Sequence, residues 1–474
     1  MTIDVLTDNT LLGAFEFYLG KDDTDQFDPS YNYDGWKTLV HVCRRWRCIV
    51  FASPRRLDLN FWCTTQRSVD SKTLDTWPAL PIVIHVPAMK SKGNVTNIIG
   101  ALSHHNRVRK IWYCNERFQD SLLKEFAAID EPFPALTFLL LSYSGQNVPF
   151  LLPDSFLGGS APRLRSLYLY GIPYPSIGKL LSSTTNLVRL LLDRIPHSGY
   201  IVPETIIPCL STLLGLESLV LRFQHPRSRV HRGSRHPPPL TRVVLPSLTF
   251  FQFRGDIEYL EDILSQIETF SLNRCQFWLF NQLVFDTPLL GHFIRRTETF
   301  MTAHTARVEF SSWAVEVILL GREEMPNNER KALRFKITCD PLDWQISAVA
   351  QVLNSSLYSL PTLESLEVAI DHEDWQGEIE VVQWREFLHP FTFVKKMTMV
   401  REGSIQLVSP ALQELAGERA TEVLPALQDL FFRTYGGQPS GPVKEAIERL
   451  IAIRQLDGHP VTVHYEDTES EAYV

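Results

Sequence analysis

The sequence predicts an α/β fold in which short parallel strands alternate with helices along a stacked, repeating chain. Three observations lead to this prediction: one apolar pattern recurs along the 474 residues, its copies have similar spacing, and helical segments separate them. The pattern is L-x-x-L-x-L. Its last three positions alternate, which is typical of a short strand with one buried face.

Clear copies of the pattern begin at Leu136, Leu164, Leu187, Leu216, Leu248, Leu363 and Leu427, and weaker copies at Val108, Leu272, Leu333 and Val394. From Val108 to Leu272 the copies begin 23–32 residues apart, close to the roughly 20–29 residues of leucine-rich repeats. The interval of 61 residues between Leu272 and Leu333 predicts one more strand, around Arg307–Phe310. We therefore expect a leucine-rich-repeat-like solenoid, with parallel strands lining a concave wall and helices on the convex side.

The segments between the strands favour helices, because their apolar residues recur at helical spacing. These segments are 120–129, 203–214, 257–267, 343–357, 380–387 and 409–415. A doubly wound α/β domain also alternates strands and helices, but it does not require a leading Leu three residues before the next one. Five prolines, Pro134, Pro162, Pro246, Pro361 and Pro425, stand just before predicted strands and should mark the entrance of each repeat.

The C-terminal part predicts a cap on the repeats. Residues 441–453 form an amphipathic pattern with Pro442 at an early helical position, and residues 461–465 read as a last strand. An acidic tail follows. We expect three parts: a helical module at 1–60, an irregular solenoid at 61–440, and a cap with the tail at 441–474.

Composition and charge exclude several classes of protein. With 46 basic and 54 acidic residues the formal charge is −8, and 44% of the residues are hydrophobic, so the chain is neither disordered nor an overall basic nucleic-acid binder. No apolar run approaches the ~18 residues of a membrane span, and the N-terminus lacks the basic start of a secretory signal. Seven scattered cysteines fit reduced, mostly buried thiols, so we expect a cytoplasmic or nuclear protein without nucleic-acid or membrane partners.

Motifs that carry catalysis are not found in the sequence. Neither H-E-x-x-H nor G-x-S-x-G occurs, and the glycines around Lys179 have the wrong spacing for a phosphate loop. Asp371-His-Glu-Asp374 could form a metal or acid/base site, but a solvated loop after the preceding strand explains the cluster much better. We expect no enzymatic activity, no cofactor and no metal ion.

The first sixty residues lack the repeat and predict two helices. Apolar residues recur at helical spacing over 6–19, with Thr7 or Asp8 as the N-cap, and again over 36–51. An acidic, turn-rich stretch separates the two helices. Residues 57–61 are the first candidate strand.

This segment resembles an F-box, a small helical module of about fifty residues. The phrase Val42-Cys-Arg-Arg-Trp-Arg47, followed by Pro54 and Leu57, matches the later part of that motif, while Thr7 stands where the family usually has Pro. The chain as a whole resembles fungal F-box/leucine-rich-repeat-like proteins. Phrases that carry this resemblance begin at Trp77, Gly158 and Phe280.

The resemblance implies a non-catalytic substrate receptor of a cullin–RING ubiquitin ligase. F-box modules bind the Skp-type adaptor, and the repeat domain receives the protein substrate. By position, the adaptor contacts should come from Leu6, Leu11, Leu12, Phe15, Leu39, Val42 and Trp46. Several of these residues could instead hold the small module together. The alternative function is an interaction scaffold with a degenerate F-box that no longer binds the adaptor, which Thr7 and the acidic insert favour.

Two sets of residues are candidates for binding the substrate. Outward strand positions on the concave wall give the first set: Ser166, Tyr168, Arg189, Glu217, Ser218, Glu364, Ser365 and Glu367. The Pro-rich segment 225–239 gives the second: Arg227, Arg229, Arg232 and Arg235. That segment is either a solvated insertion or a basic arm for an acidic or phosphorylated partner, because Arg pairs well with phosphate.

Overall fold

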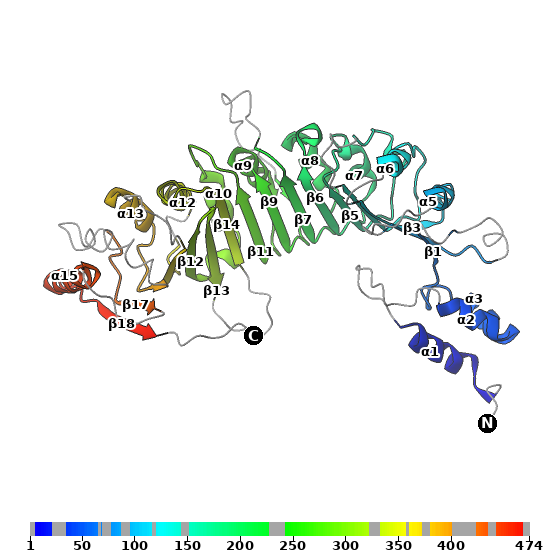
Figure 1. Cartoon of the computed structure of the whole chain (residues 1–474), viewed down its shortest axis with the longest axis horizontal. Coiled ribbons are helices and arrows are strands. Elements are labelled where there is room, and N and C mark those ends of the chain that lie inside the picture. The colour runs from blue at the N-terminus through cyan, green and yellow to red at the C-terminus, as the bar shows by residue number, and fades with distance from the viewer. Residues whose placement is uncertain are drawn as a thin grey trace. The chain divides into compact units, whose positions relative to one another are not determined.

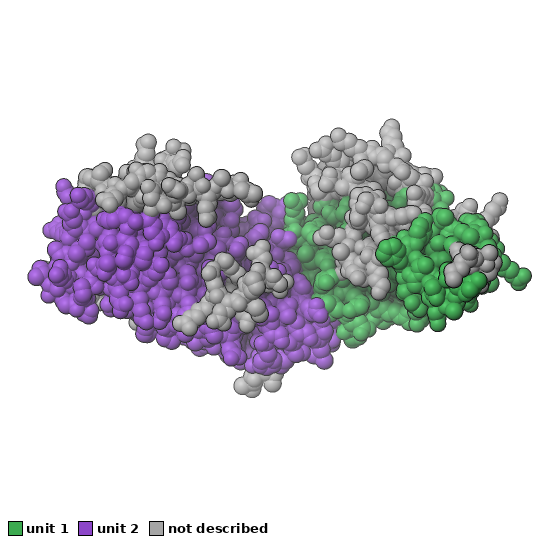
Figure 2. All heavy atoms as spheres, turned by 90° about the horizontal axis from the view of Figure 1, so that it is seen from below, with its two compact units in different colours: residues 1–201 green, residues 202–474 purple. Residues whose placement is uncertain are grey.

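The structure is a computed structural model of the whole chain. It describes residues 5–20, 35–64, 68, 77–86, 95–115, 120–143, 151–226, 242–321, 332–356, 360–371, 380–400, 423–434 and 442–467. The chain divides into two compact units, residues 1–201 and residues 202–474 (Figure 2). This division lies inside the segment predicted as one solenoid, and each unit is described by itself.

Unit 1 begins with three helices and continues with alternating strands and helices (Figure 1). Its elements are α1 (Asp8–Leu19), α2 (Gly35–Val42), α3 (Arg44–Ala52), β1 (Phe61–Cys63), β2 (Ile82–Val86), α5 (Val95–Leu102), β3 (Val108–Asn115), α6 (Asp120–Ala127), β4 (Phe138–Tyr143), β5 (Ser166–Tyr170), α7 (Ile177–Ser183) and β6 (Arg189–Ile195). The strands follow the order β1-β2-β3-β4-β5-β6, and each neighbouring pair is parallel.

Unit 2 repeats the alternation with longer connections. Its elements are α8 (Pro203–Leu210), β7 (Ser218–Phe223), β8 (Val243–Val244), β9 (Phe250–Gly255), α9 (Ile257–Gln266), β10 (Ile267–Glu268), β11 (Arg274–Leu279), α10 (Pro288–Arg296), α11 (Glu298–Met301), β12 (Ala303–Ser311), β13 (Ala314–Gly321), β14 (Ala332–Thr338), α12 (Leu342–Ser356), β15 (Ser365–Asp371), α13 (Val381–Leu388), β16 (Lys396–Val400), β17 (Asp429–Thr434), α15 (Pro442–Leu456) and β18 (Thr462–Asp467). The large sheet follows the order β7-β9-β11-β14-β13-β12-β15-β16-β17-β18, and β8 pairs separately with β10.

The repeating unit is confirmed by its buried leucines and by one recurring turn. The leading residues Leu136, Leu164 and Leu187 are fully buried, each two residues before its strand. In the seven clear copies and at Val394, the N–H of the leading residue donates to the carbonyl three residues earlier, as in Leu164 N–H to Ala161 O at 3.0 Å. The five prolines noted in the sequence occupy the second position of this turn, where the fixed φ of proline fits.

The inner faces of the strands form continuous apolar rows. Leu139, Leu167 and Leu190 stand in register on β4, β5 and β6, and all three are fully buried. In unit 2 the corresponding row runs through Leu219, Phe251, Cys275 and Leu333. In each unit the helices lie along one face of the strands (Figure 1), and in a stacked repeat such helices cover the apolar face.

One glycine marks a corner of the repeat. Gly171 follows β5 with φ +65°, and a Cβ at this position would collide with the carbonyl oxygen of Tyr143. Its N–H donates to the carbonyl of Asp193 at 2.8 Å. Only glycine combines this backbone conformation with so close an approach.

The expectation of a wholly parallel wall is wrong in unit 2. β13 runs antiparallel to both β12 and β14, and β12 pairs with β15 instead of β11. The strand predicted around Arg307–Phe310 exists as part of β12. The turn between β12 and β13 contains only two residues, and a connection this short can join only antiparallel strands.

The predicted helices are present where the chain is described. The segments at 120–129, 203–214, 257–267, 343–357 and 380–387 correspond to α6, α8, α9, α12 and α13, whereas 409–415 lies outside the described residues. α13 begins with a capping box between Glu380 and Gln383. α15 and β18 correspond to the predicted cap helix and last strand.

A buried carboxylate joins two helices of unit 2. Glu261 of α9 is 3% exposed, and its two oxygens accept from the N–H groups of Leu289 at 2.9 Å and Leu290 at 2.7 Å. These N–H groups lie in the first turn of α10, where backbone N–H groups have no acceptor within the helix. The carboxylate therefore caps α10 from the neighbouring helix and fixes their packing.

Candidate interaction surfaces

The helical N-terminal segment has a core built from most of the residues predicted to contact an adaptor. Thr7 is the N-cap of α1, and its Oγ1 accepts from the N–H of Thr10 at 3.2 Å. The side chains that follow at helical spacing turn inward. Leu11, Leu12, Phe15 and Leu39 are at most 6% exposed. Their first role is to hold the three helices together.

The second predicted helix is in fact two helices, α2 and α3, separated at Cys43. This residue has extended backbone angles (φ −160°, ψ 170°), and its Sγ accepts from the N–H of Trp46 at 3.5 Å. It therefore acts as the N-cap of α3. Sequence periodicity missed the break because the apolar spacing continues through it.

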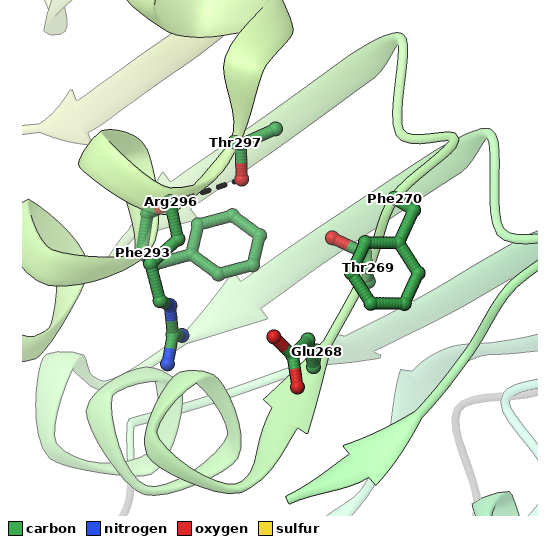
Figure 3. A pocket seen from close by; sticks show the side chains of 6 residues that line it. All are labelled: Glu268, Thr269, Phe270, Phe293, Arg296 and Thr297. Carbon is green, nitrogen blue, oxygen red and sulfur yellow. Dashed lines mark hydrogen bonds between the residues drawn. The ribbon is translucent and has the colours of Figure 1, made fainter.

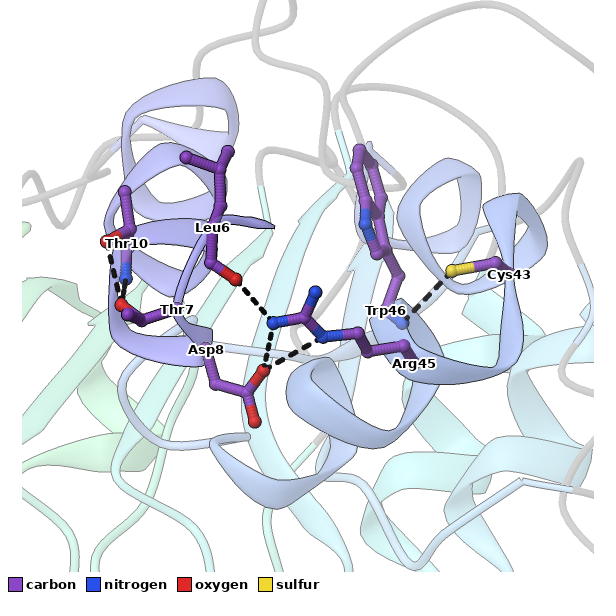
Figure 4. Close-up of polar contacts among 7 residues, drawn as sticks. All are labelled: Leu6, Thr7, Asp8, Thr10, Cys43, Arg45 and Trp46. Carbon is purple, nitrogen blue, oxygen red and sulfur yellow. Dashed lines mark hydrogen bonds and ion pairs between the residues drawn. The ribbon is translucent and has the colours of Figure 1, made fainter. Parts of the chain in front are cut away.

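A pair of charged side chains fastens the start of α1 to α3 (Figure 4). Nε and Nη2 of Arg45 donate to Oδ1 of Asp8 at 3.0 and 2.8 Å, and Nη2 also donates to the carbonyl of Leu6. At the other end of α1, Arg56 makes a two-bond pair with Glu16 at 2.7 and 2.8 Å, which raises the pKa of the guanidinium. These contacts orient α1 against the rest of the segment.

Several large apolar side chains of this segment remain exposed. Phe17 is 92% exposed, Val5 69%, Val42 55%, Tyr18 53% and Leu6 39%. The carbonyl of Leu6 accepts a hydrogen bond from Arg45 (Figure 4). Val42 is the last residue of α2. Trp46 is half-buried against the ring of Phe15 at 4.8 Å. Of the seven residues predicted to face an adaptor, Leu6 and Val42 are exposed.

The helical segment is joined to the first strand by aromatic packing. Trp36 is 2% exposed and contacts the rings of Phe51, Phe61 and Trp77 at 6.1, 5.7 and 5.9 Å. Its indole N–H donates to the carbonyl of Asn60 at 3.2 Å. The segment at 1–60 therefore continues into β1 without a break in packing.

A row of aromatic rings crosses the outward face of β1 to β5 in unit 1. Trp62, His85, Trp112, Phe138 and Tyr168 contact one another in that order, with ring centroids 6.3, 6.0, 5.1 and 5.4 Å apart. Burial lowers the pKa of His85 to about 4, so the imidazole is neutral at pH 7. Of these five residues, only Tyr168, at one end of the row, was predicted from the sequence. The other four residues could have been predicted from the aromatic side chains at outward positions of the predicted strands.

The remaining wall residues lie in different environments. Arg189 and Glu217 are exposed, whereas Ser166 is 5% exposed and Ser218 and Ser365 are half-buried. Glu364 pairs with Lys395 at 2.8 Å. Arg227, Arg229, Arg232 and Arg235 lie outside the described residues, as does most of the acidic cluster that begins at Asp371.

Two arginines on the outward face of β12 to β18 are paired with carboxylates. Arg307 binds Glu367 at 2.9 Å, and Arg433 binds Glu466 at 2.7 Å and approaches Glu367 at 3.7 Å. The hydrogen bond from Arg433 lowers the pKa of the Glu466 carboxyl. Glu367, predicted to contact a substrate, is thus engaged in a network within the sheet.

A small cavity lies between β10 and α10 (Figure 3). It is lined by Glu268, Thr269, Phe270, Phe293, Arg296 and Thr297 and holds about 20 Å³, which is room for a water-sized group. Thr297 Oγ1 donates to the carbonyl of Phe293 at 3.0 Å. This space is too small for a metabolite or a cofactor.

Among the residues that the structure describes, no group of three or more His, Cys, Asp and Glu side chains is placed to hold a metal ion. No helix in the described ranges combines the length and the apolar character of a membrane span. The seven cysteines are free thiols. Cys63, Cys275 and Cys339 are buried, but Cys43 and Cys48 are exposed, so the expectation of mostly buried thiols holds for only some of them.

Comparison with known proteins adds little to this geometry. No family model matches the chain, and no curated protein matches it. The matching solved structures include the leucine-rich repeat-containing protein LegL7 from Legionella pneumophila, which is 12% identical and has a TM-score of 0.25, with 82% of this chain and 97% of that chain covered. Because backbones at this TM-score do not superpose globally, the mixed α/β repeat architecture rests on the strand register and recurring turns described above.

Proposed function

We propose that this chain is a non-catalytic substrate receptor of an SCF-type cullin–RING ubiquitin ligase. Its N-terminal helices would form an F-box that binds the Skp-type adaptor, and the outward faces of its strands would receive a protein substrate. Such a receptor needs no cofactor or metal ion, and it would work in the cytoplasm or the nucleus. It acts by holding the substrate close to the ligase.

The observation that carries this proposal is the exposed apolar surface of the N-terminal helices. Phe17 and Val42 expose 92% and 55% of their surface, although the segment has its own buried core. Exposed apolar side chains gathered on a small module mark an interface, because burying them against a partner is favourable. Val42 begins the Val42–Arg47 phrase, which carries the resemblance to the F-box.

The geometry refines the set of adaptor-binding residues. We assign the contacts to exposed side chains, namely Val5, Leu6, Phe17, Tyr18 and Val42. Leu11, Leu12, Phe15 and Leu39 would support this surface from inside, with Trp46 at its margin. Thr7 is compatible with the proposal, since it begins α1 with a side-chain cap that proline could not supply.

Co-expression with a Skp-type adaptor tests the proposal. The tagged wild-type chain should retain the adaptor through purification, and Val42→Asp and Phe17→Asp should each lose it, because both place a charge in an apolar interface. Leu214→Asp is the matched control, since Leu214 is 59% exposed in unit 2 and its replacement should leave adaptor binding unchanged.

If the wild-type chain does not retain the adaptor, the ligase role is wrong. The chain would then be an interaction scaffold with a degenerate F-box. The burial of Leu11, Leu12, Phe15 and Leu39 favours this second function, because it leaves fewer of the expected adaptor contacts at the surface.

A further inference from the structure

Four strands of unit 2 align a row of cationic and aromatic side chains. Arg222, Arg254, Trp278 and Lys336 occupy equivalent positions on β7, β9, β11 and β14, as the strand register gives directly. The preceding residue on each strand, from Leu221 to Phe335, is buried. Since successive side chains alternate between faces, the row points to the face opposite the apolar core.

Four cations of this region lie on aromatic rings, whereas Arg334 of β14 pairs with Glu316 of β13 at 3.3 Å. The guanidinium of Arg222 is 5.6 Å from the centre of Trp278. Arg254 lies over Phe280 at 5.4 Å, Arg274 over Phe250 at 4.5 Å, and Lys336 over Trp313 at 3.7 Å. A ring attracts a cation without neutralising its charge, so the side chains are held in place and stay positive.

Three cations of this region differ from Arg307 and Arg433, which lie further along the same sheet. Within the described residues, Arg254, Arg274 and Lys336 have no carboxylate within 4.0 Å. By contrast, Arg307 and Arg433 both pair with glutamates on neighbouring strands. Three cations without a carboxylate partner among the described residues therefore lie on the adjacent strands β9, β11 and β14, in a chain whose formal charge is −8. Lys396 of β16 is a separate cation that lies over the ring of Phe431 at 4.0 Å.

We propose that the outward face of β7, β9, β11 and β14 binds a short Asp- and Glu-rich peptide segment of a partner protein. This inference rests on the proposed function in one respect: the peptide would belong to the substrate. Strand spacing places Arg254 and Lys336 about 10 Å apart, the length of about three residues of extended chain. Two carboxylates separated by that distance could contact both cations.

The arrangement favours carboxylates over phosphates. A phosphate carries up to two charges and is best held where several arginines converge on one point. Here the cations lie on separate strands, about 4.8 Å from one to the next, and each has its own ring. Singly charged groups spread along a peptide match this spacing better.

The arrangement also argues against a nucleic acid. A single strand would stack its bases on aromatic faces, but cations already lie over a face of Trp278, Phe280 and Trp313. Beyond Lys336 the row continues into Glu316 and Glu309, which would repel a long phosphate backbone. A short acidic peptide avoids both problems.

Fluorescence anisotropy with the full chain tests this proposal. The probe is a fluorescein-labelled peptide of about twelve alternating Glu and Ser residues, compared with a Gln/Ser peptide, a phosphoserine/Gln peptide and single-stranded oligo(dT). The Glu/Ser peptide should bind best and weaken as salt rises, because exposed charges are screened. Binding no tighter than that of the Gln/Ser peptide would overturn the proposal, and a preference for the phosphoserine peptide or oligo(dT) would overturn the choice of ligand.

Matched variants locate the site. Arg254→Gln and Lys336→Gln should each weaken binding about three- to tenfold, as expected for one lost ion pair. Arg433→Gln removes the same charge from a cation that is already paired, and should change the affinity less than about twofold. Equal effects of all three variants would contradict the assignment. Circular dichroism shows whether each variant is folded. If a variant does not fold, the salt dependence of peptide binding by the wild-type chain still tests the proposal.

The same preparations separate this inference from the proposed function. Arg254→Gln and Lys336→Gln should retain the Skp-type adaptor like the wild-type chain. If the chain binds the acidic peptide but no adaptor, the acidic-peptide site is supported and the ligase role is wrong. If it retains the adaptor and ignores the peptide, this inference alone is wrong.

Discussion

Protonation of His85 should destabilise the strand region that contains it. His85 is 4% exposed between the rings of Trp62 and Trp112, and burial lowers its pKa from 6.5 to about 4. A histidine in the unfolded chain takes up a proton near pH 6.5, whereas the folded chain resists it until about pH 4. The contribution to stability is therefore complete above pH 6.5 and is lost as the pH falls toward 4.

The two pKa values give the size of the effect. A shift of one unit corresponds to about 1.4 kcal/mol, so the full difference is about 3 kcal/mol below pH 4. At pH 5 the linkage relation gives a loss of about 2 kcal/mol, while at pH 7.5 it is close to zero. The variant His85→Phe keeps an aromatic ring between the two tryptophans and removes the titration.

Hydrogen exchange of the amides in β2 measures the local free energy of opening. The stability of His85→Phe relative to the wild-type chain should rise by about 2 kcal/mol between pH 7.5 and pH 5. Other titrating groups affect both proteins alike and cancel in the difference. A difference that stays constant over this pH range would show that His85 is not held neutral by burial.

Two further predictions concern the stability of the repeat. Leu190→Ala should destabilise β6 by about 2–5 kcal/mol because Leu190 is fully buried, whereas Leu191→Ala on the outward face should cost less than about 1 kcal/mol. Thermal unfolding with hydrogen exchange compares them, and equal losses would disprove the assigned faces. Glu261→Ala should destabilise the start of α10 by about 1–3 kcal/mol, because two buried N–H groups lose their acceptors. Glu261→Gln keeps one acceptor and should lose less stability. If hydrogen exchange in Glu261→Ala becomes faster only outside α9 and α10, the capping role is wrong.

The sequence was most informative where burial repeats at a fixed period. Leu136, Leu164 and Leu187 could be placed from spacing alone, because each strand needs the same inward residue at its entrance. The antiparallel β13 could not be predicted in this way. Alternation reports which face is buried but not strand direction, and here a two-residue turn decides the direction.

The candidate sites were harder to predict for a related reason. Helical spacing groups Leu11, Leu12 and Phe15 on one face, but it does not tell whether that face packs inside the module or against a partner. The aromatic row of unit 1 and the cationic row of unit 2 depend on strand register. Residues such as Arg254 and Lys336 are more than eighty positions apart, so their alignment becomes visible only when the strands are paired.

The central claim, that the N-terminal helices bind a Skp-type adaptor, is tested most directly by mixing the two purified proteins. Size-exclusion chromatography with light scattering should detect a 1:1 complex of the wild-type chain and the adaptor. Val42→Asp should elute as the free chain, and Leu214→Asp should behave like the wild type. Separate elution of the wild-type chain and the adaptor at micromolar concentrations would contradict the claim.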